Sequence, residues 1–182
     1  MDALATDGRT RRFELLAMPH LDAAFNLARW LTGNATDAED VVQDAYLRAF
    51  RYFDAFRGEN FRVWLLTIVR NSFLTWVQDN RSGRVLFQPD ISDVAETWAD
   101  PAPGPEAMLL EQVDRETLAT LVAQLPAEYR EILILREIED LSYKEIAQVA
   151  DIPVGTVMSR LARARQSLRK AWIRQEKGEH RS

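Results

Sequence analysis

Residues 141–172 read LSYKEIAQVADIPVGTVMSRLARARQSLRKAW, a pattern that indicates two consecutive helices. Ser142 and Glu145 have the spacing of a capping box, in which each side chain accepts a hydrogen bond from the other residue's backbone amide. A short helix should therefore begin here and run to about residue 150. Asp151-Ile152-Pro153 ends it, and a proline there suits the first position of a second helix over residues 154–172. A further helix is expected upstream, over residues 127–137.

The second helix of this pair has one apolar and one polar stripe. The apolar stripe follows helical spacing and should pack inward: Val157, Leu161, Ala164 and Leu168. The opposite stripe carries groups that can meet base edges and phosphates: Thr156, Ser159, Arg160 and Arg163. A short helix, a tight turn and a polar-faced second helix predict a helix-turn-helix over residues 143–163. The alternative is a capped helix pair of an ordinary helical bundle with an arginine-rich exposed face.

Charge is distributed unevenly along the chain. The 182 residues carry a formal net charge of −5, which by itself argues against a nucleic-acid partner. Residues 154–174, however, contain six bases and no acid, so the rest of the chain carries −11. A basic segment on an acidic body favours a local contact with a polyanion, although a solvated basic helix end would have the same composition.

Helical periodicity also fills the N-terminal part, and a segment of different composition separates the two parts. Helices are expected over residues 13–31, from a capping box at Thr36 and Glu39 to about residue 53, and over residues 61–79. Residues 82–105 lack the helical periodicity of apolar residues and are rich in proline, glycine and acidic residues. We therefore expect an all-α fold of two small helical domains joined by a flexible acidic linker, the second domain being the helix-turn-helix.

Composition excludes several kinds of site. The chain has no cysteine and two histidines, so we expect no disulfide, no thiol catalysis, no metal centre and no cofactor. The acids of residues 37–44 lie on one helix without a histidine, cysteine or phosphate-binding loop to complete an active site, so a carboxylate-based hydrolase is disfavoured and the protein is not expected to be an enzyme. The N-terminus does not read as a signal peptide, and no apolar run approaches the ~20 residues of a membrane span. A cytoplasmic location is expected.

The C-terminal motifs resemble a known family. LPAEYREILILREIEDLSYKEIA at 125–147 and PVGTVMSRLARAR at 153–165 are similar to region 4 of the extracytoplasmic-function (ECF) sigma factors of bacterial RNA polymerase. In that family, region 4 binds the −35 promoter element. The resemblance implies the following −35 contact residues: Thr156, Ser159, Arg160, Arg163 and Arg165.

The N-terminal motifs resemble the same family independently. DAEDVVQD at 37–44 is similar to region 2.2, which docks on the clamp of the polymerase β′ subunit. The resemblance implies the core-binding residues Asp40, Val41, Val42, Gln43 and Asp44, of which the carboxylates and the amide can accept hydrogen bonds from a basic partner. Asp37 is better explained as an acid at a helix start.

FRGENFRVWLLTIVRN at 56–71 resembles region 2.3, which leads into the helix that reads and opens the −10 element. The residues implied to contact the −10 element are Asn60, Phe61, Trp64, Arg70, Asn71 and Thr75. Aromatic side chains can stack on unpaired bases. Trp64, however, also sits at core spacing, so a purely structural role stays open.

Taken whole, the resemblance implies a sigma factor that directs core RNA polymerase to promoters, in a bacterial stress response and under the control of an anti-sigma factor. Its implied partners are the β′ clamp, the β flap and promoter DNA, without membrane insertion or a small-molecule substrate. The expected domains are region 2 at residues 10–81, a linker at 82–105, region 4 at 106–174 and a tail at 175–182. The competing hypothesis is a free-standing regulator that uses the helix-turn-helix alone, for which a region 2.2 motif has no role.

Overall fold

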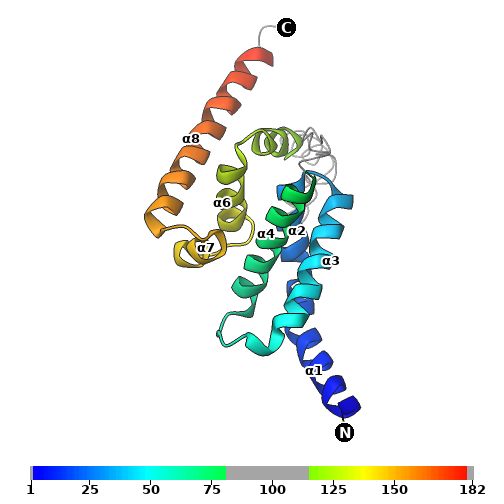
Figure 1. Ribbon diagram of the computed structural model, residues 1–182. Coiled ribbons are helices and arrows are strands. Elements are labelled where there is room, and N and C mark those ends of the chain that lie inside the picture. The colour runs from blue at the N-terminus through cyan, green and yellow to red at the C-terminus, as the bar shows by residue number, and fades with distance from the viewer. Residues whose placement is uncertain (1, 81–114, 180–182) are drawn as a thin grey trace, which may run out of the picture. The chain divides into compact units, whose positions relative to one another are not determined.

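The computed structural model describes residues 2–80 and 115–179, and every element in these two ranges is helical (Figure 1). The chain divides into two compact units. The expected all-α fold with two helical domains is thus confirmed. The predicted linker, residues 82–105, and residues 106–114 of the predicted second domain lie outside the described residues.

The first unit is a bundle of helices. Its elements are α1 (Asp2–Ala17), the 3₁₀ helix η1 (Met18–His20), α2 (Leu21–Thr32), α3 (Ala35–Tyr52), the 3₁₀ helix η2 (Phe53–Ala55) and α4 (Phe61–Asn80). Helices α2, α3 and α4 pack against one another pairwise (Figure 1).

The sequence predicted one helix over residues 13–31, and the structure corrects this. Pro19 lies within the first residues of η1 and interrupts the helix between Ala17 and Leu21. A proline ring has no backbone N–H and clashes with the preceding turn, so a continuous helix cannot pass through it without distortion.

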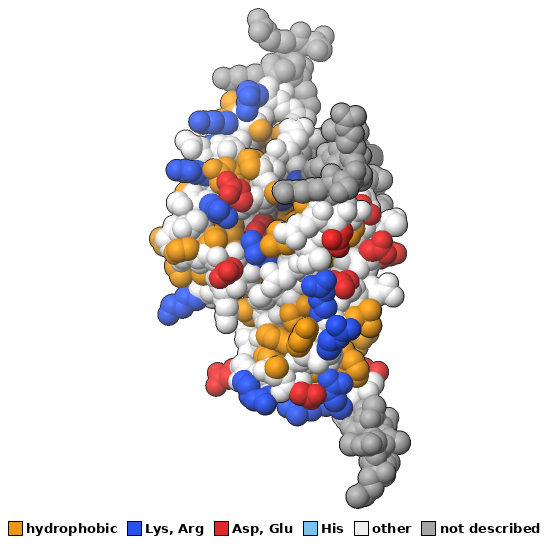
Figure 2. Space-filling model, in the orientation of Figure 1, with side chains coloured by type: hydrophobic (Ala, Val, Ile, Leu, Met, Phe, Trp, Pro, Cys, Tyr) orange, Lys and Arg blue, Asp and Glu red, His pale blue; other side chains and the backbone are white. Residues whose placement is uncertain are grey.

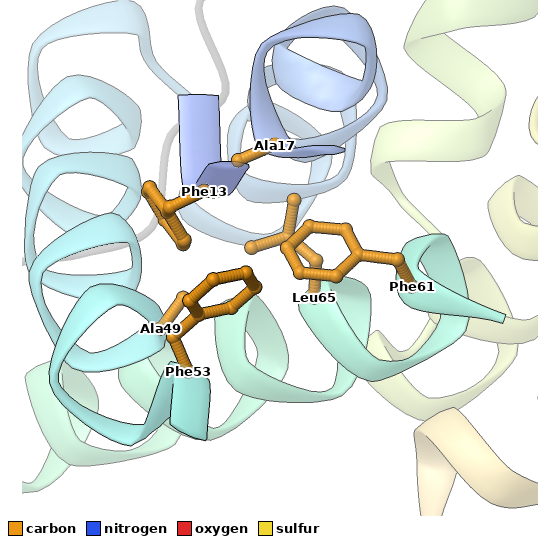
Figure 3. Packing of buried hydrophobic residues seen from close by; sticks show 6 residues of the cluster. All are labelled: Phe13, Ala17, Ala49, Phe53, Phe61 and Leu65. Carbon is orange, nitrogen blue, oxygen red and sulfur yellow. The ribbon is translucent and has the colours of Figure 1, made fainter. Parts of the chain in front are cut away.

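An aromatic cluster forms much of the core of the first unit. Phe13, from α1, packs edge-to-face against Phe50, Phe53 and Phe61 with ring centroids 5.2, 5.3 and 6.3 Å away. Figure 3 shows side chains from α1, α3, η2 and α4 pointing toward one another in this cluster. Edge-to-face aromatic pairs add about 0.5–1.5 kcal/mol beyond the area they bury, so α1 is held firmly on the bundle.

The start of α3 also differs from the prediction. The helix begins at Ala35, and Asn34 is its N-cap, with the Asn34 Oδ1 atom accepting from the Asp37 backbone N–H at 2.9 Å. Gly33 ends α2 in the left-handed conformation with φ 86°. Thr36, the predicted cap, therefore lies inside the helix rather than in front of it.

The second unit contains a helix over residues 115–123, α6 (Ala127–Glu137) and α8 (Val154–Glu179), with α7 (Tyr143–Ala150) between α6 and α8 in sequence. The predicted capping box is confirmed: Ser142 N–H donates to Glu145 Oε2 at 2.8 Å, and Glu145 N–H donates to Ser142 Oγ at 3.3 Å. Asp151 turns the chain between α7 and α8 with φ 52°. Helix α8 continues past residue 174 into the predicted tail.

Helices α6 and α8 pack against each other through the predicted apolar stripe. Val157, Leu161 and Ala164 are buried, whereas Leu168 is half-buried. Arg130 of α6 is buried as well and donates from Nη1 to the Ala123 carbonyl oxygen at 2.7 Å. Burial lowers the pKa of Arg130 to about 10.

Among the described residues, no helix is long and apolar enough to cross a membrane.

Candidate nucleic-acid and partner interface

The outer face of α8 presents part of the predicted −35 set. Ser159 and Arg163 are exposed and Thr156 is half-buried. The Ser159 hydroxyl donates to the Thr156 carbonyl oxygen at 3.1 Å. These residues lie in the first two to three turns of the helix that follows the tight turn, where a recognition helix contacts base edges.

Two other predicted −35 residues are engaged by α6. Arg160 Nη2 lies 3.0 Å from Glu128 Oε2, and Arg165 Nη2 lies 2.5 Å from Glu137 Oε1. The hydrogen bond to Glu137 raises the pKa of Arg165, which keeps the guanidinium charged. The structure therefore separates the predicted set into residues on the open face and two arginines paired with carboxylates on a neighbouring helix.

An apolar row lies beside the polar face of α8, and none of its residues is among the predicted −35 contacts. It consists of Val154, Met158 and Ala162, which follow one another at four-residue spacing. Val154 and Met158 are 38% and 53% exposed, and Ala162 is exposed as well. Figure 2 shows apolar side chains between the basic ones along the visible side of α8. Their four-residue spacing, which the sequence alone shows, places them on one helix face.

The predicted core-binding motif lies on α3, and only part of it faces outward. Asp40 and Gln43 are exposed. Asp44 is half-buried and forms an ion pair with Arg48 at 2.7 Å. Leu47, four residues after Gln43, continues the same face with 64% of its side chain exposed. We refer to Asp40, Gln43 and Leu47 as the α3 ridge.

Val41 and Val42 do not belong to this surface, and here the structure corrects the prediction. Their exposed fractions are 1% and 8%, so both side chains pack into the core of the first unit and cannot contact a partner. Burying an apolar valine side chain stabilises the fold by roughly 1.5 kcal/mol or more. The two valines therefore hold the helix in place behind the ridge. Leu47 was not among the predicted core-binding residues, although its seven-residue spacing after Asp40 places it on the same helix face.

The predicted −10 residues divide between a helix face, a cap and the core. Trp64, Asn71 and Thr75 share one face of α4, at spacings of seven and four residues. The Thr75 hydroxyl donates to the Asn71 carbonyl oxygen at 3.1 Å. Asn60 precedes α4, and its Oδ1 atom accepts from Val63 N–H at 3.1 Å, while Arg70 is half-buried.

Phe61 is a core residue rather than a contact residue. It is 6% exposed and packs in the aromatic cluster, so it cannot stack on a base. Trp64 is half-buried, with its ring centroid 5.1 Å from that of Phe56 and 5.2 Å from that of Phe61. Trp64 thus packs against the aromatic cluster while remaining partly exposed. In the described ranges no group of three or more His, Cys, Asp or Glu residues could hold a metal ion.

The class of protein follows from the two units and from their similarity to known proteins. The family model "Sigma-70 region 2" matches residues 16–83, and "Sigma-70, region 4" matches residues 115–168. The first match includes α2, α3 and α4 with the α3 ridge, and the second includes the helix-turn-helix. Fold and motifs together define a sigma factor of the sigma-70 class.

Individual relatives narrow this class. The chain is 34% identical over 168 residues to the ECF RNA polymerase sigma factor SigE of Mycolicibacterium smegmatis, covering 92% of this chain and 64% of that protein. It is 35% identical over 174 residues to the RNA polymerase sigma-H factor of Pseudomonas aeruginosa, covering 90% and 88%. The sigma factor RpoE of Bartonella quintana, solved in complex with the anti-sigma factor NepR, has a TM-score of 0.70 at 26% identity over 90% of this chain and 98% of that one. The chain belongs to the ECF sigma factors, a family of transcription initiation factors.

Proposed function

We propose that this protein is a promoter-specificity subunit that acts together with core RNA polymerase. Residues 10–81 would bind the core enzyme and the −10 element, and residues 106–174 would bind the −35 element. The observation that carries the proposal is the presence of both surfaces in one chain: an exposed α3 ridge and a helix-turn-helix with an open outer face. A free-standing regulator would need only the second surface.

The α3 ridge is the proposed contact with the polymerase β′ clamp. The Asp40 carboxylate and the Gln43 amide can accept hydrogen bonds from a basic surface. Leu47, one turn further along α3, would add an apolar contact with the same partner. The second unit would in addition contact the β flap. Both partners belong to the core enzyme, so the site of action would be the bacterial cytoplasm.

The α4 face is the proposed −10 surface. Trp64 is half-buried and would use its exposed part for stacking, and Asn71 and Thr75 offer polar groups on the same helix face. A positively charged neighbour is needed to hold the phosphate backbone, and Arg70 lies one residue before Asn71. The unpaired bases would be held by stacking and hydrogen bonds.

Helix α8 is the proposed −35 reader. Ser159 and Arg163 are exposed near its start, with the half-buried Thr156 beside them, and these side chains can reach base edges. Basic side chains farther along the helix would contact DNA phosphates; they are Arg169, Lys170 and Arg174. Phosphate contacts position a protein on DNA without selecting a sequence. Binding should therefore combine local sequence reading with a salt-dependent phosphate component.

Control by an anti-sigma factor is part of the proposal. It is supported by the similarity to a sigma factor that was solved bound to an anti-sigma factor. Such a partner would hold the factor inactive until a signal releases it, which fits a role in a bacterial stress response.

Run-off transcription with purified core polymerase over a randomised promoter library tests the proposal. The expected result is selection of a defined −35 and −10 pair that core enzyme alone does not select. A gel shift of the chain without polymerase discriminates the alternative. Tight, sequence-specific binding by the free chain, together with no effect on transcription by core enzyme, would identify a free-standing regulator and overturn the proposal.

A further inference from the structure

The apolar row on α8 lies where a recognition helix meets the bases. Val154 is the first residue of α8, Met158 lies one turn further and Ala162 two turns further. Base edges are contacted mainly by the N-terminal residues of such a helix. Single exposed apolar residues are common on protein surfaces and need no explanation. Three exposed apolar residues on one face at the start of this helix do need an explanation, because their side chains do not belong to the buried stripe.

The surroundings of Met158 are open. A Cβ atom placed on the neighbouring Gly155 would meet no atom of the described residues within 4 Å, so none of these residues covers the helix at Gly155. Met158 itself is 53% exposed. Its side chain is long and adaptable, with a polarisable thioether that can follow an irregular apolar surface. The start of α8 thus combines one reaching apolar side chain with a neighbour that allows close approach.

The chemistry of the major groove provides one apolar feature. Thymine carries a C5-methyl group there, whereas the other bases present only hydrogen-bonding groups, and apolar side chains recognise thymine through this methyl group. Arg165, three residues after Ala162 and on the same side of the helix, is paired with Glu137, whereas Arg163 is exposed on the adjoining polar face. The apolar row is therefore suited to methyl groups, while the exposed Ser159 and Arg163 on the adjoining face can reach polar base edges or phosphates.

We propose that the apolar row reads thymine methyl groups in the −35 element, with Met158 as the principal specificity-determining contact. This inference rests on the proposed function and adds a residue and a base to it. The positive charge of this helix favours DNA over a protein as the partner of the apolar row, since residues 154–174 contain six basic residues and no acidic residue. The −35 element should contain at least one thymine opposite Met158.

Deoxyuridine substitution tests this contact, because deoxyuridine lacks only the methyl group of thymidine. The full-length chain is assembled with core polymerase on the promoter selected from the library. Each −35 thymine, on either strand, is replaced singly by deoxyuridine, and open-complex formation is measured in competition with the all-thymine promoter. We expect wild type to lose about fourfold at one or two positions, the factor that corresponds to one buried methyl-sized group.

Three variants complete the test. Met158→Ala should lose the discrimination between thymine and uracil at those positions, and Met158→Leu should retain it. Ile173→Ala removes another exposed apolar side chain, 42% exposed on the same helix. Because Ile173 lies about 22 Å farther along the helix at ~1.5 Å per residue, this variant should keep the wild-type pattern.

The outcomes separate the two levels of inference. If the holoenzyme selects no promoter, the proposed function fails and this inference fails with it. If a promoter is selected but uracil has no effect on wild type, or Met158→Ala keeps the wild-type discrimination, only the thymine contact is overturned. A general loss of transcription by Met158→Ala without any uracil effect would assign the row to a protein partner instead.

Discussion

At the scale of single residues, Tyr46 makes stability depend on pH. Its hydroxyl donates to the Ala17 carbonyl oxygen at 2.9 Å, which ties α3 to the end of α1. Burial, with a smaller contribution from the Asp22 carboxylate, raises the pKa of Tyr46 to about 12. In the unfolded chain the pKa of a tyrosine is about 10. Between these two values the folded state keeps a proton that the unfolded state has lost, so stability falls as pH rises through this window.

We expect Tyr46→Phe to be less stable than wild type at neutral pH by about 1 kcal/mol, because it loses one hydrogen bond. It should also lose less stability than wild type as pH rises above about 10, since no group is left to ionise at this position. Thermal unfolding followed by circular dichroism over a series of pH values measures both effects.

Tyr52→Phe is the matched control for this prediction, because the side chain of Tyr52 is 57% exposed. It should follow wild type at every pH. If Tyr46→Phe and wild type lose stability in parallel in alkaline solution, the hydroxyl of Tyr46 is not the group responsible.

At the scale of elements, the cap of α3 provides a second prediction. Asn34 accepts the Asp37 N–H, and Thr36 lies inside the helix. Asn34→Ala should therefore cost about 1 kcal/mol of stability, the usual effect of removing an N-cap side chain. Thr36→Ala should change stability little or raise it slightly, since alanine has the higher helix propensity. Chemical unfolding of both variants decides between the two residues, and a larger loss for Thr36→Ala would contradict the capping geometry.

Local patterns in the sequence predicted those features of the elements that depend on near neighbours. The Ser142–Glu145 capping box and the stripe of Val157, Leu161 and Ala164 are set by residues within a few positions of each other, and both were predicted correctly. The cap at Asn34 was missed because asparagine and threonine are both good caps and only the path of the chain after Gly33 chooses between them.

Features that depend on distant residues could not be predicted in this way. The partners of Arg160 and Arg165 lie on α6, 32 and 28 residues earlier in the chain, and no local spacing joins them. Likewise, apolar residues within a motif carry no mark of whether they face a partner or the core. Val41 and Val42 proved to be buried, and Leu47 proved to be exposed. Their positions follow only from how α3 packs on α2 and α4.

The ion pairs between α6 and α8 lead to a third prediction. Both pairs are partly exposed, so each contributes at most about 1 kcal/mol to stability. Their main effect should be on DNA binding, because the carboxylates compete with phosphates for Arg160 and Arg165. We expect Glu128→Gln and Glu137→Gln to bind promoter more tightly at low salt, with the slope of log affinity against log salt steeper by about 0.9 for each freed arginine.

Glu116→Gln is the control for these variants. Glu116 is exposed in the same unit, and its substitution makes the same change in net charge. Holoenzyme binding to the selected promoter is measured over a range of salt concentrations. Equal effects of all three variants would mean that net charge alone matters. Weaker binding by Glu137→Gln would mean that the carboxylate orients Arg165 for DNA rather than competing for it.

At the scale of the whole molecule, charge explains why the two surfaces belong to one chain. Outside residues 154–174 the net charge is −11, so most of the molecule is repelled by DNA. The basic helix alone must overcome this repulsion, and the free chain should bind promoter duplex weakly. Attachment to core polymerase would raise the effective concentration of α8 at the −35 element without any new contact to DNA. Polymerase binding and promoter binding are therefore expected to be coupled through the α3 ridge.

The last prediction tests this coupling with changes far from α8 in sequence. Asp40→Arg combined with Gln43→Ala should abolish binding to core polymerase, because a basic side chain replaces an acceptor on the α3 ridge. Both residues are exposed, so stability should change by no more than about 0.5 kcal/mol per substitution. Promoter retention in the presence of core enzyme should be lost together with core binding, although every residue of α8 is unchanged. Glu14→Arg makes the same reversal of charge at an exposed position on α1 and should leave both activities intact. A double variant that no longer binds core enzyme but still retains promoter would show that α8 acts independently of polymerase.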